Sequence, residues 1–399
     1  MNNKRNLVIL FITLVIMMMG FGIIIPILPD LVVRYGGSGM AMGILMAIFS
    51  AMQFLFSPMW GSLSDRFGRK PILMLGVFGN AISMLALGLS TQLWMLFAAR
   101  GLAGILSSAT LPTAMAYISD STDEKSRGGG MGVIGAAMGL GMILGPGAGG
   151  MLSAISLHAP FYFAAGLSML AVVAIWLFLP ESLVAEKRET SLKLQGPQLN
   201  AMWESLFGPL AFLFIAAFMI SFAMTNFEGI YAYYAKDRYS YGPETIGYIL
   251  TAIGVVSVIA QGALTGIATR KFGEVNVIKV SLIASVIGFL VMLLAKDLAA
   301  VIFTAAFFVL SNAMLRPAVS SLISQRTTQG QGIAMGLNNA YMSLGRVIGP
   351  LWAGAVIDIN MFFPFITGAA VMMLGFIASL AYLKEIPSPE PRPAIESAD

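Results

Sequence analysis

Four ionisable residues stand inside long apolar stretches of the chain: Arg100, Glu228, Arg316 and Arg346. A charge removed from water is costly unless it is paired or used, so each of these side chains is a candidate functional group. Glu228 is the only acid well inside such a stretch. A carboxyl group in an apolar cavity can bind and release a proton near neutral pH, or it can attract a cationic ligand. The alternative is a structural pair between Glu228 and one of the arginines.

The composition defines the surroundings of these groups. The chain of 399 residues is 58% hydrophobic and 11% charged, whereas soluble domains are about 25% charged. So few polar residues cannot cover a water-soluble surface, which predicts an integral membrane protein that has the lipid bilayer as a partner. The chain has no cysteine, and its only histidine is His158. We therefore predict no metal site and no cofactor, and nothing indicates nucleic-acid binding.

The apolar stretches are long enough to cross a bilayer, because about 20 apolar residues do so as a helix. We expect an all-α integral membrane protein with twelve transmembrane helices, near 7–28, 39–60, 72–90, 92–118, 131–153, 160–180, 207–235, 243–268, 276–295, 298–324, 333–356 and 362–383. The polar segment 181–206 divides them into two sets of six. This predicts an N-terminal six-helix bundle (1–180), a cytoplasmic central loop (181–206), a C-terminal six-helix bundle (207–384) and a disordered cytoplasmic tail (385–399).

The distribution of lysine and arginine predicts the orientation, because cytoplasmic loops carry the excess of these residues. With the N-terminus inside, 16 of them lie at inner positions, and the outer side holds Arg34, Lys236, Arg238 and Lys296. Both termini are therefore expected in the cytoplasm of a multi-pass cell membrane protein.

The two halves of the chain repeat. Residues 131–150, "MGVIGAAMGLGMILGPGAGG", align without gaps to residues 335–354, "MGLNNAYMSLGRVIGPLWAG", with nine identities at an offset of 204. Each stretch is the fifth helix of its half. Parallel six-helix repeats about an axis along the membrane normal are the architecture of secondary transporters, with the site between the halves. We expect this pseudo-twofold arrangement here.

The loop "GSLSDRFGRKP" at 61–71 concentrates charge between two apolar stretches. We expect Gly61 and Gly68 to provide the backbone freedom of a tight turn. Asp65 could accept hydrogen bonds from the N-terminus of a neighbouring helix, where the dipole favours an anion. Arg69 could pair with Asp120. The alternative is that these charges only enforce topology.

Small residues cluster in the fifth stretch, namely Gly141, Gly145, Pro146, Gly149 and Gly150. Glycines spaced by four residues let two helices approach backbone to backbone, and Pro146 removes a helical hydrogen bond and bends the helix. This pattern predicts a close-packed, kinked seam, although generic small-residue packing would look similar.

These motifs together resemble the major facilitator superfamily. "GSLSDRFGRKP" is similar to its signature loop, "ARGLAG" (99–104) to the helix-4 arginine motif of its proton-coupled members, "GLGMILGPGAGG" (139–150) to the helix-5 motif of its antiporters, and "GFGIIIPILP" (20–29) to the helix-1 motif of twelve-helix drug:proton antiporters. The resemblance implies the major facilitator fold. It also implies a latch between Asp65 and the start of helix 11, near Ile333, that holds the outward-open state.

The stretches "NFEGIYAYY" and "LRPAVS" resemble those of Nor- and Bmr-type multidrug exporters. The resemblance and the polar or aromatic character of the spans suggest a proton-coupling group of Glu228, Arg100 and Arg316. The expected substrate pocket comprises Gln53, Phe21, Met138, Tyr231, Tyr234, Phe308, Asn312, Asn338, Tyr341 and Arg346. This chain departs from those exporters at Ala313, where they carry an acid, and at Arg346, where they carry a neutral polar residue.

We therefore expect a monomeric exporter, not an enzyme, that exchanges protons for amphipathic, cationic drugs by alternating access. A tetracycline-specific exporter and a narrow metabolite exporter are the alternatives. An integral membrane enzyme would need clustered catalytic groups that the spans lack, and no Gly-rich phosphate loop supports ATP drive. A channel is disfavoured by the two-bundle repeat.

Overall fold

The computed structural model describes residues 3–122, 124–184, 186, 188–189, 196, 199–327 and 330–383. The expected tail (385–399) and much of the central loop lie outside these residues. In the described part, 12 helices are long and apolar enough to cross a membrane. Each contains at least 19 residues, which matches a hydrocarbon core of about 30 Å at about 1.5 Å per residue.

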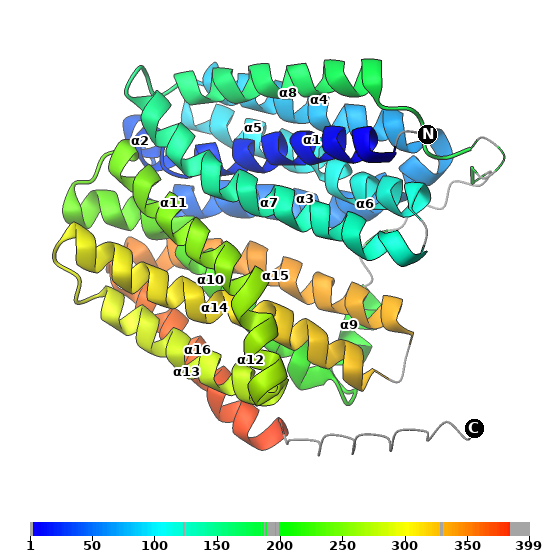
Figure 1. Ribbon diagram of the computed structural model, residues 1–399. Helices are drawn as coiled ribbons and strands as arrows, with labels where there is room; N and C mark the ends of the chain where they lie inside the picture. The colour runs from blue at the N-terminus through cyan, green and yellow to red at the C-terminus, as the bar shows by residue number, and fades with distance from the viewer. Residues whose placement is uncertain are drawn as a thin grey trace, which may run out of the picture.

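The first six spans comprise eight helical segments. They are α1 (Asn3–Ile24), α3 (Gly39–Phe67), α4 (Arg69–Gly88), α5 with η1 and α6 (Leu93–Leu106, Ser107–Ala109, Thr110–Ser121), α7 (Glu124–Ser153) and α8 (Ala159–Phe178). The short helix α2 (Leu28–Arg34) follows α1. In Figure 1 these helices lie together in the upper half of the molecule.

The last six spans form the lower half of Figure 1. They are α10 (Ala211–Tyr239), α11 with the π-turn η3 and α12 (Pro243–Ile259, Ala260–Leu264, Thr265–Phe272), α13 (Glu274–Met292), α14 (Leu298–Arg326), α15 (Gln331–Ile357) and α16 (Phe363–Tyr382). The short helix α9 (Leu199–Ser205) precedes them.

The helix bundle has two ends, the terminal face and the far face. The terminal face carries the start of α1, the turn at Gly68, α9 and the start of α15. The far face carries α2, the start of α3, the start of α11 and the end of α15. The N-terminus and α9 lie to the right in Figure 1, and α2 lies to the left.

The two halves meet along two seams, α3 with α15 and α7 with α11. A Cβ atom on Gly354 would lie 2.6 Å from the Gly39 carbonyl oxygen and 2.9 Å from the Gly43 Cα. A Cβ atom on Gly247 would lie 2.5 Å from the Pro146 carbonyl oxygen and 3.1 Å from the Gly150 Cα. Gly43 and Gly247, and Gly150 and Gly354, are each 204 residues apart, so the sequence repeat is also a repeat of backbone contacts.

Both seams are tight toward the far face and open toward the terminal face. Near the terminal face, Cβ atoms on Gly128, Gly132, Gly332 and Gly336 would meet no atom within 4 Å. Ile333, at the start of α15, is 56% exposed. The halves are therefore closed at the far face and separated at the terminal face.

Candidate functional site

Glu228 of α10, Arg316 of α14 and Arg346 of α15 form a polar centre in the C-terminal half. The Glu228 carboxylate lies within electrostatic reach of both arginines, and the two arginines lie within reach of each other. Among the described residues, no salt bridge within 4.0 Å involves any of the three. None of these three side chains is fully buried. The three charged groups thus lie near one another without forming an ion pair.

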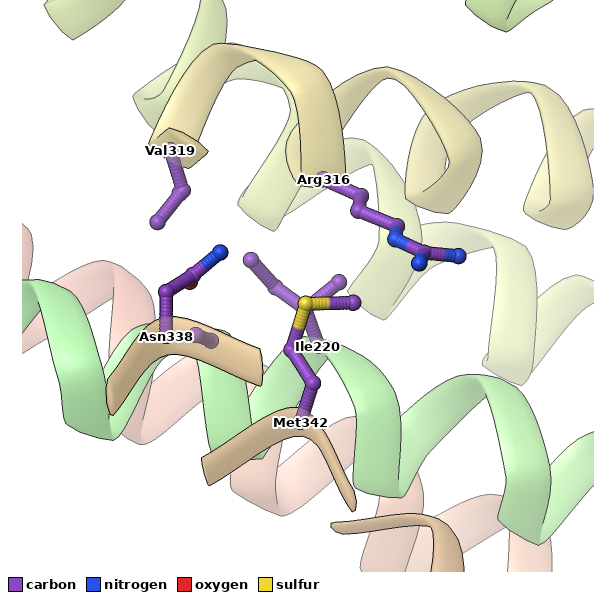
Figure 2. A pocket seen from close by; sticks show the side chains of 6 residues that line it. Ile220, Arg316, Val319, Asn338 and Met342 are labelled. Atoms are coloured by element: carbon purple, nitrogen blue, oxygen red, sulfur yellow. The ribbon is translucent and has the colours of Figure 1, made fainter. Parts of the chain in front are cut away.

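A narrow crevice opens beside this polar centre, between α10, α14 and α15. It is too narrow in this conformation to be a complete drug-sized pocket, which has roughly 300–1,000 Å³. Figure 2 shows Arg316 and Asn338 projecting from facing helices, with Met342 and Ile220 between them. The Asn338 amide nitrogen donates to Ser320 Oγ at 3.1 Å, and its Oδ1 is buried without a partner in the described chain. The crevice is a narrow gap between the three helices, and Arg316 and Asn338 are the polar side chains that line it.

Arg100 does not belong to the polar centre. It is 1% exposed, its Nε donates to the Leu45 carbonyl oxygen at 3.2 Å, and its guanidinium carbon lies 4.5 Å from the centre of the Phe49 ring. Phe21, which packs on Phe49 at 5.4 Å, is the second ring near this cation. Aromatic rings and a carbonyl group thus hold the guanidinium group within the N-terminal half, and the expected role of Arg100 in proton coupling stays a prediction.

Three of the expected pocket aromatics belong to the interior of the C-terminal bundle instead. Phe308 is 0%, Tyr234 1% and Tyr231 2% exposed. Phe308 packs at 4.1 Å from Phe289 and 5.1 Å from Phe227, and Tyr231 packs at 4.6 Å from Phe227. The assignment of these rings to an open pocket is not supported here, because they fill the space between helices of one half. Tyr231 retains one feature of a site, since its hydroxyl group is buried without a partner in the described chain.

The other expected pocket residues lie in different places. Tyr341 faces α9: its hydroxyl group donates to the Met202 carbonyl oxygen at 2.7 Å, and its ring stacks on Phe214. Asn312 is buried, with its amide nitrogen unpartnered within the described residues. Gln53 is half-buried in α3 and Met138 half-buried in α7. Of the expected pocket residues, Asn338 lines the crevice beside Arg316, and Arg346 is itself one of the three charges of the polar centre.

The charged turn at residues 61–71 forms a network within the N-terminal half. Arg69 Nη1 lies 2.5 Å from Asp65 Oδ1, and Arg69 Nε lies 2.9 Å from Asp120 Oδ2. The Arg69–Asp120 pair expected from the sequence is present. The contact of Asp65 with the start of α15 is absent, because the halves are separated at the terminal face and Asp65 is 46% exposed.

The two glycines of this turn differ. Gly68 has φ +101°, a conformation that residues with a side chain rarely adopt. Gly61 lies inside α3, which continues to Phe67, and a Cβ atom there would meet no atom within 4 Å. The expectation that Gly61 forms the turn is wrong, because the helix extends almost two turns further than its apolar part.

Sequence reasoning missed Glu181, which caps the start of α4. Its carboxylate accepts hydrogen bonds from the backbone N–H groups of Arg69 at 2.9 Å and Lys70 at 3.2 Å. An anion at a helix N-terminus is stabilised by the unpaired N–H groups and the helix dipole. In the sequence, the one indication of this role is that Glu181 comes just after the sixth span.

The small residues of α7 form the expected close seam. Cβ atoms on Gly145 and Gly149 would lie 2.7 Å from the Met19 carbonyl oxygen and 2.5 Å from that of Ile23, both in α1. A Cβ atom on Gly141 would also meet α1. Gly150 faces α11 of the other half, as does the carbonyl oxygen of Pro146, whereas the Pro146 ring faces Gly22 of α1. This helix therefore touches its own bundle with one row of glycines and the opposite bundle with another.

Two polar contacts that the sequence did not reveal join the halves at the far face. The Asp358 carboxylate, just after α15, accepts hydrogen bonds from the N–H groups of Gly39 and Met40 at 2.8 and 3.0 Å. Lys236 Nζ, near the end of α10, lies 2.5 Å from Asp30 Oδ1 in α2. Both contacts bridge the two halves at the closed far face.

Twelve spans in two halves, glycine seams between the halves and a charged centre in mid-membrane define a membrane transporter of the two-bundle class. The sequence profile of the Major Facilitator Superfamily matches residues 10–270 and 213–398. The chain belongs to this superfamily.

Individual relatives agree with this membership. The chain is 31% identical over 374 residues to "Multidrug resistance protein 2" of Bacillus subtilis, covering 93% of this chain and 94% of the relative. It is 32% identical over 360 residues to "Tetracycline resistance protein, class C" of Escherichia coli, covering 89% and 90%. The crystal structure of the human organic anion transporter MFSD10 superposes with a TM-score of 0.68 at 25% identity, covering 95% of this chain and all of that one.

Proposed function

We propose that this protein is a drug exporter that exchanges protons for amphipathic substrates by alternating access, as a monomer. The observation that carries this proposal is the polar centre, because Glu228 is the only acid among the described residues that lies well inside a span. An ionisable group at this depth is costly unless it is used. The relatives that are multidrug and tetracycline resistance proteins support the substrate class.

The proposed moving units are the N-terminal bundle (1–180) and the C-terminal bundle (207–384). The glycine seams support this division, because the most extensive contacts between the halves in the described chain are those of α3 with α15 and α7 with α11. Rocking of one unit against the other would open the far face and bring the start of α15 to Asp65. The Asp65 latch and the Arg69–Asp120 pair would then act together.

The terminal face is proposed to be cytoplasmic. Lys4, Arg5, Arg66, Arg69 and Lys70 lie at this face, in agreement with the positive-inside rule. The structure would then represent the inward-open state, in which the polar centre takes up substrate from the cytoplasm. Because the chain has no cysteine, single cysteines can test this without background. A cysteine in place of Ser156 should react with an impermeant maleimide added to intact cells, and one in place of Gly196 should not.

Proton-driven transport tests the proposal. We would reconstitute the purified protein in liposomes, impose a pH gradient and follow ethidium uptake. We expect uptake by the wild type that collapses when the gradient is dissipated, and loss of this uptake in Glu228→Gln. Glu244→Gln is the matched control, because Glu244 lies at the far face, where it accepts a hydrogen bond from the Tyr248 hydroxyl group. Wild-type accumulation by Glu228→Gln would contradict the role of Glu228.

A tetracycline-specific exporter is the second candidate, because the class C tetracycline resistance protein is as similar to this chain as the multidrug relative. The same liposomes distinguish the two. Uptake of tetracycline without uptake of ethidium would favour the second candidate.

A further inference from the structure

The charges of the polar centre do not balance. Arg316 and Arg346 lie within electrostatic reach of a single acid, Glu228, and the helix turn before Arg316 carries Asn312 and Ala313 and no acid. The centre therefore carries one excess positive charge when Glu228 is ionised and two when it is protonated. A fixed positive excess at this depth favours a substrate that brings an anionic group over one that carries only positive charge.

The two guanidinium groups are available for such a group. Neither makes a hydrogen bond or a salt bridge to another described residue. Arg100 differs, because a carbonyl group and an aromatic ring hold its guanidinium group. A guanidinium group presents paired donors that match the two oxygens of a carboxylate. Two unpaired arginines within electrostatic reach of each other are therefore suited to a carboxylate between them.

Apart from Arg316 and Asn338, the crevice beside the polar centre is lined by apolar side chains. Ala217, Ile220, Val319 and Met342 line the crevice beside Arg316, and a thioether side chain adapts to ligands of varied shape. Hydrophobic surface next to unpaired charges fits a molecule with an apolar body and a charged end.

We propose that the preferred substrates are amphipathic zwitterions, whose carboxylate binds between Arg316 and Arg346 and whose amine meets Glu228. This proposal rests on the proposed function and specifies its substrate class. The amine and the proton compete for Glu228, as exchange requires. The carboxylate replaces Glu228 as the counterion of the arginines, so the centre is not left with two uncompensated cations. A substrate with only a permanent positive charge pairs with Glu228 but leaves both arginines without a counterion.

A matched pair of dyes tests the proposal, namely tetramethylrhodamine, which has a free carboxylate, and its methyl ester, which does not. We would titrate each with the purified full-length protein in detergent and follow fluorescence anisotropy. We expect the acid to bind at least about tenfold more tightly than the ester, the size of effect that a charge-assisted contact provides. In Arg316→Gln and Arg346→Gln this preference should fall to about twofold or less. Arg270→Gln, at an exposed position whose Nε bonds its own helix, should keep it.

Equal or tighter binding of the ester by the wild type would overturn the proposal, as would a preference that survives both substitutions or an absence of binding by either dye. If an arginine variant fails to fold, the comparison of the acid and the ester on the wild type still tests the proposal. Liposome transport distinguishes a failure of the carboxylate assignment from a failure of the proposed function. Proton-driven uptake of the ester in preference to the acid contradicts only the carboxylate assignment. Uptake of both dyes that does not depend on the pH gradient contradicts the proposed function.

Discussion

The carboxylate of Asp358 caps the first turn of α3 across the boundary between the two halves. Its two oxygens accept the Gly39 and Met40 N–H groups at 2.8 and 3.0 Å. The other seam cannot form this contact. Ala154, 204 residues before Asp358, has no carboxylate, and Pro243, 204 residues after Gly39, has no backbone N–H group. The far face is thus latched on one seam only, in a mirrored version of the latch that the sequence suggests for Asp65.

Asp358→Asn is expected to weaken closure of the far face. The amide can still accept one hydrogen bond but loses its charge, at a cost of about 1–2 kcal/mol. This corresponds to a roughly tenfold shift toward the state that is open at the far face. Spin labels at positions 34 and 359, on opposite halves of this face, would report the shift as a longer distance population.

Asp297→Asn is the matched control for this variant. Asp297 is also at the far face, but its carboxylate caps α14 within one half through the Ala300 N–H group at 2.9 Å. The control should leave the distance distribution unchanged. An equal change in both variants would show that the effect is not the latch.

Gly354→Ala is expected to prevent full closure of the same seam. The added methyl group would lie 2.6 Å from the Gly39 carbonyl oxygen, and overpacking of this kind costs about 1–3 kcal/mol. Transport should fall, and the distance between positions 34 and 359 should increase. Gly336→Ala, on the same helix but with no atom within 4 Å of the new methyl group, should behave as the wild type. Normal closure and transport by Gly354→Ala would argue against backbone contact at this seam.

The twelve spans and their repeat could be predicted from the sequence, because long apolar runs and a Gly-Pro pair at equal positions depend only on local pattern. The places of Phe308 and Tyr234 could not. An aromatic residue at helical spacing looks the same whether it faces a cavity or a neighbouring helix of its own bundle. Gly61 was misplaced because helix α3 continues beyond its apolar part into charged residues.

The roles of Glu181 and Asp358 were also hidden in the sequence. Each caps a helix that is distant along the chain, Asp358 over 319 residues to Gly39. Such contacts depend on which loops meet, and for Asp358 on which face of the transporter is closed. The absent contact of Asp65 has the same cause, since one conformation cannot form the latches of both faces.

Glu181→Gln is expected to lower stability more than a surface substitution does. The carboxylate accepts N–H groups from Arg69, Lys70 and Leu183, and an amide cannot stabilise the helix N-terminus as an anion does. We expect a loss of about 1–3 kcal/mol, seen as a lower thermal unfolding midpoint in detergent. Glu186→Gln, at an exposed position in the same segment, is the control. Identical midpoints for the two variants would contradict the capping role.

The most direct test of the central claim is a measurement of proton movement driven by the substrate. We would trap the pH-sensitive dye pyranine in liposomes that contain the protein, with equal pH on both sides, and add ethidium or tetramethylrhodamine outside. We expect that substrate entry drives protons out, so that the internal pH rises. Glu228→Gln should abolish this rise, and Glu244→Gln should preserve it. Substrate entry without a change in internal pH in the wild type would contradict proton exchange.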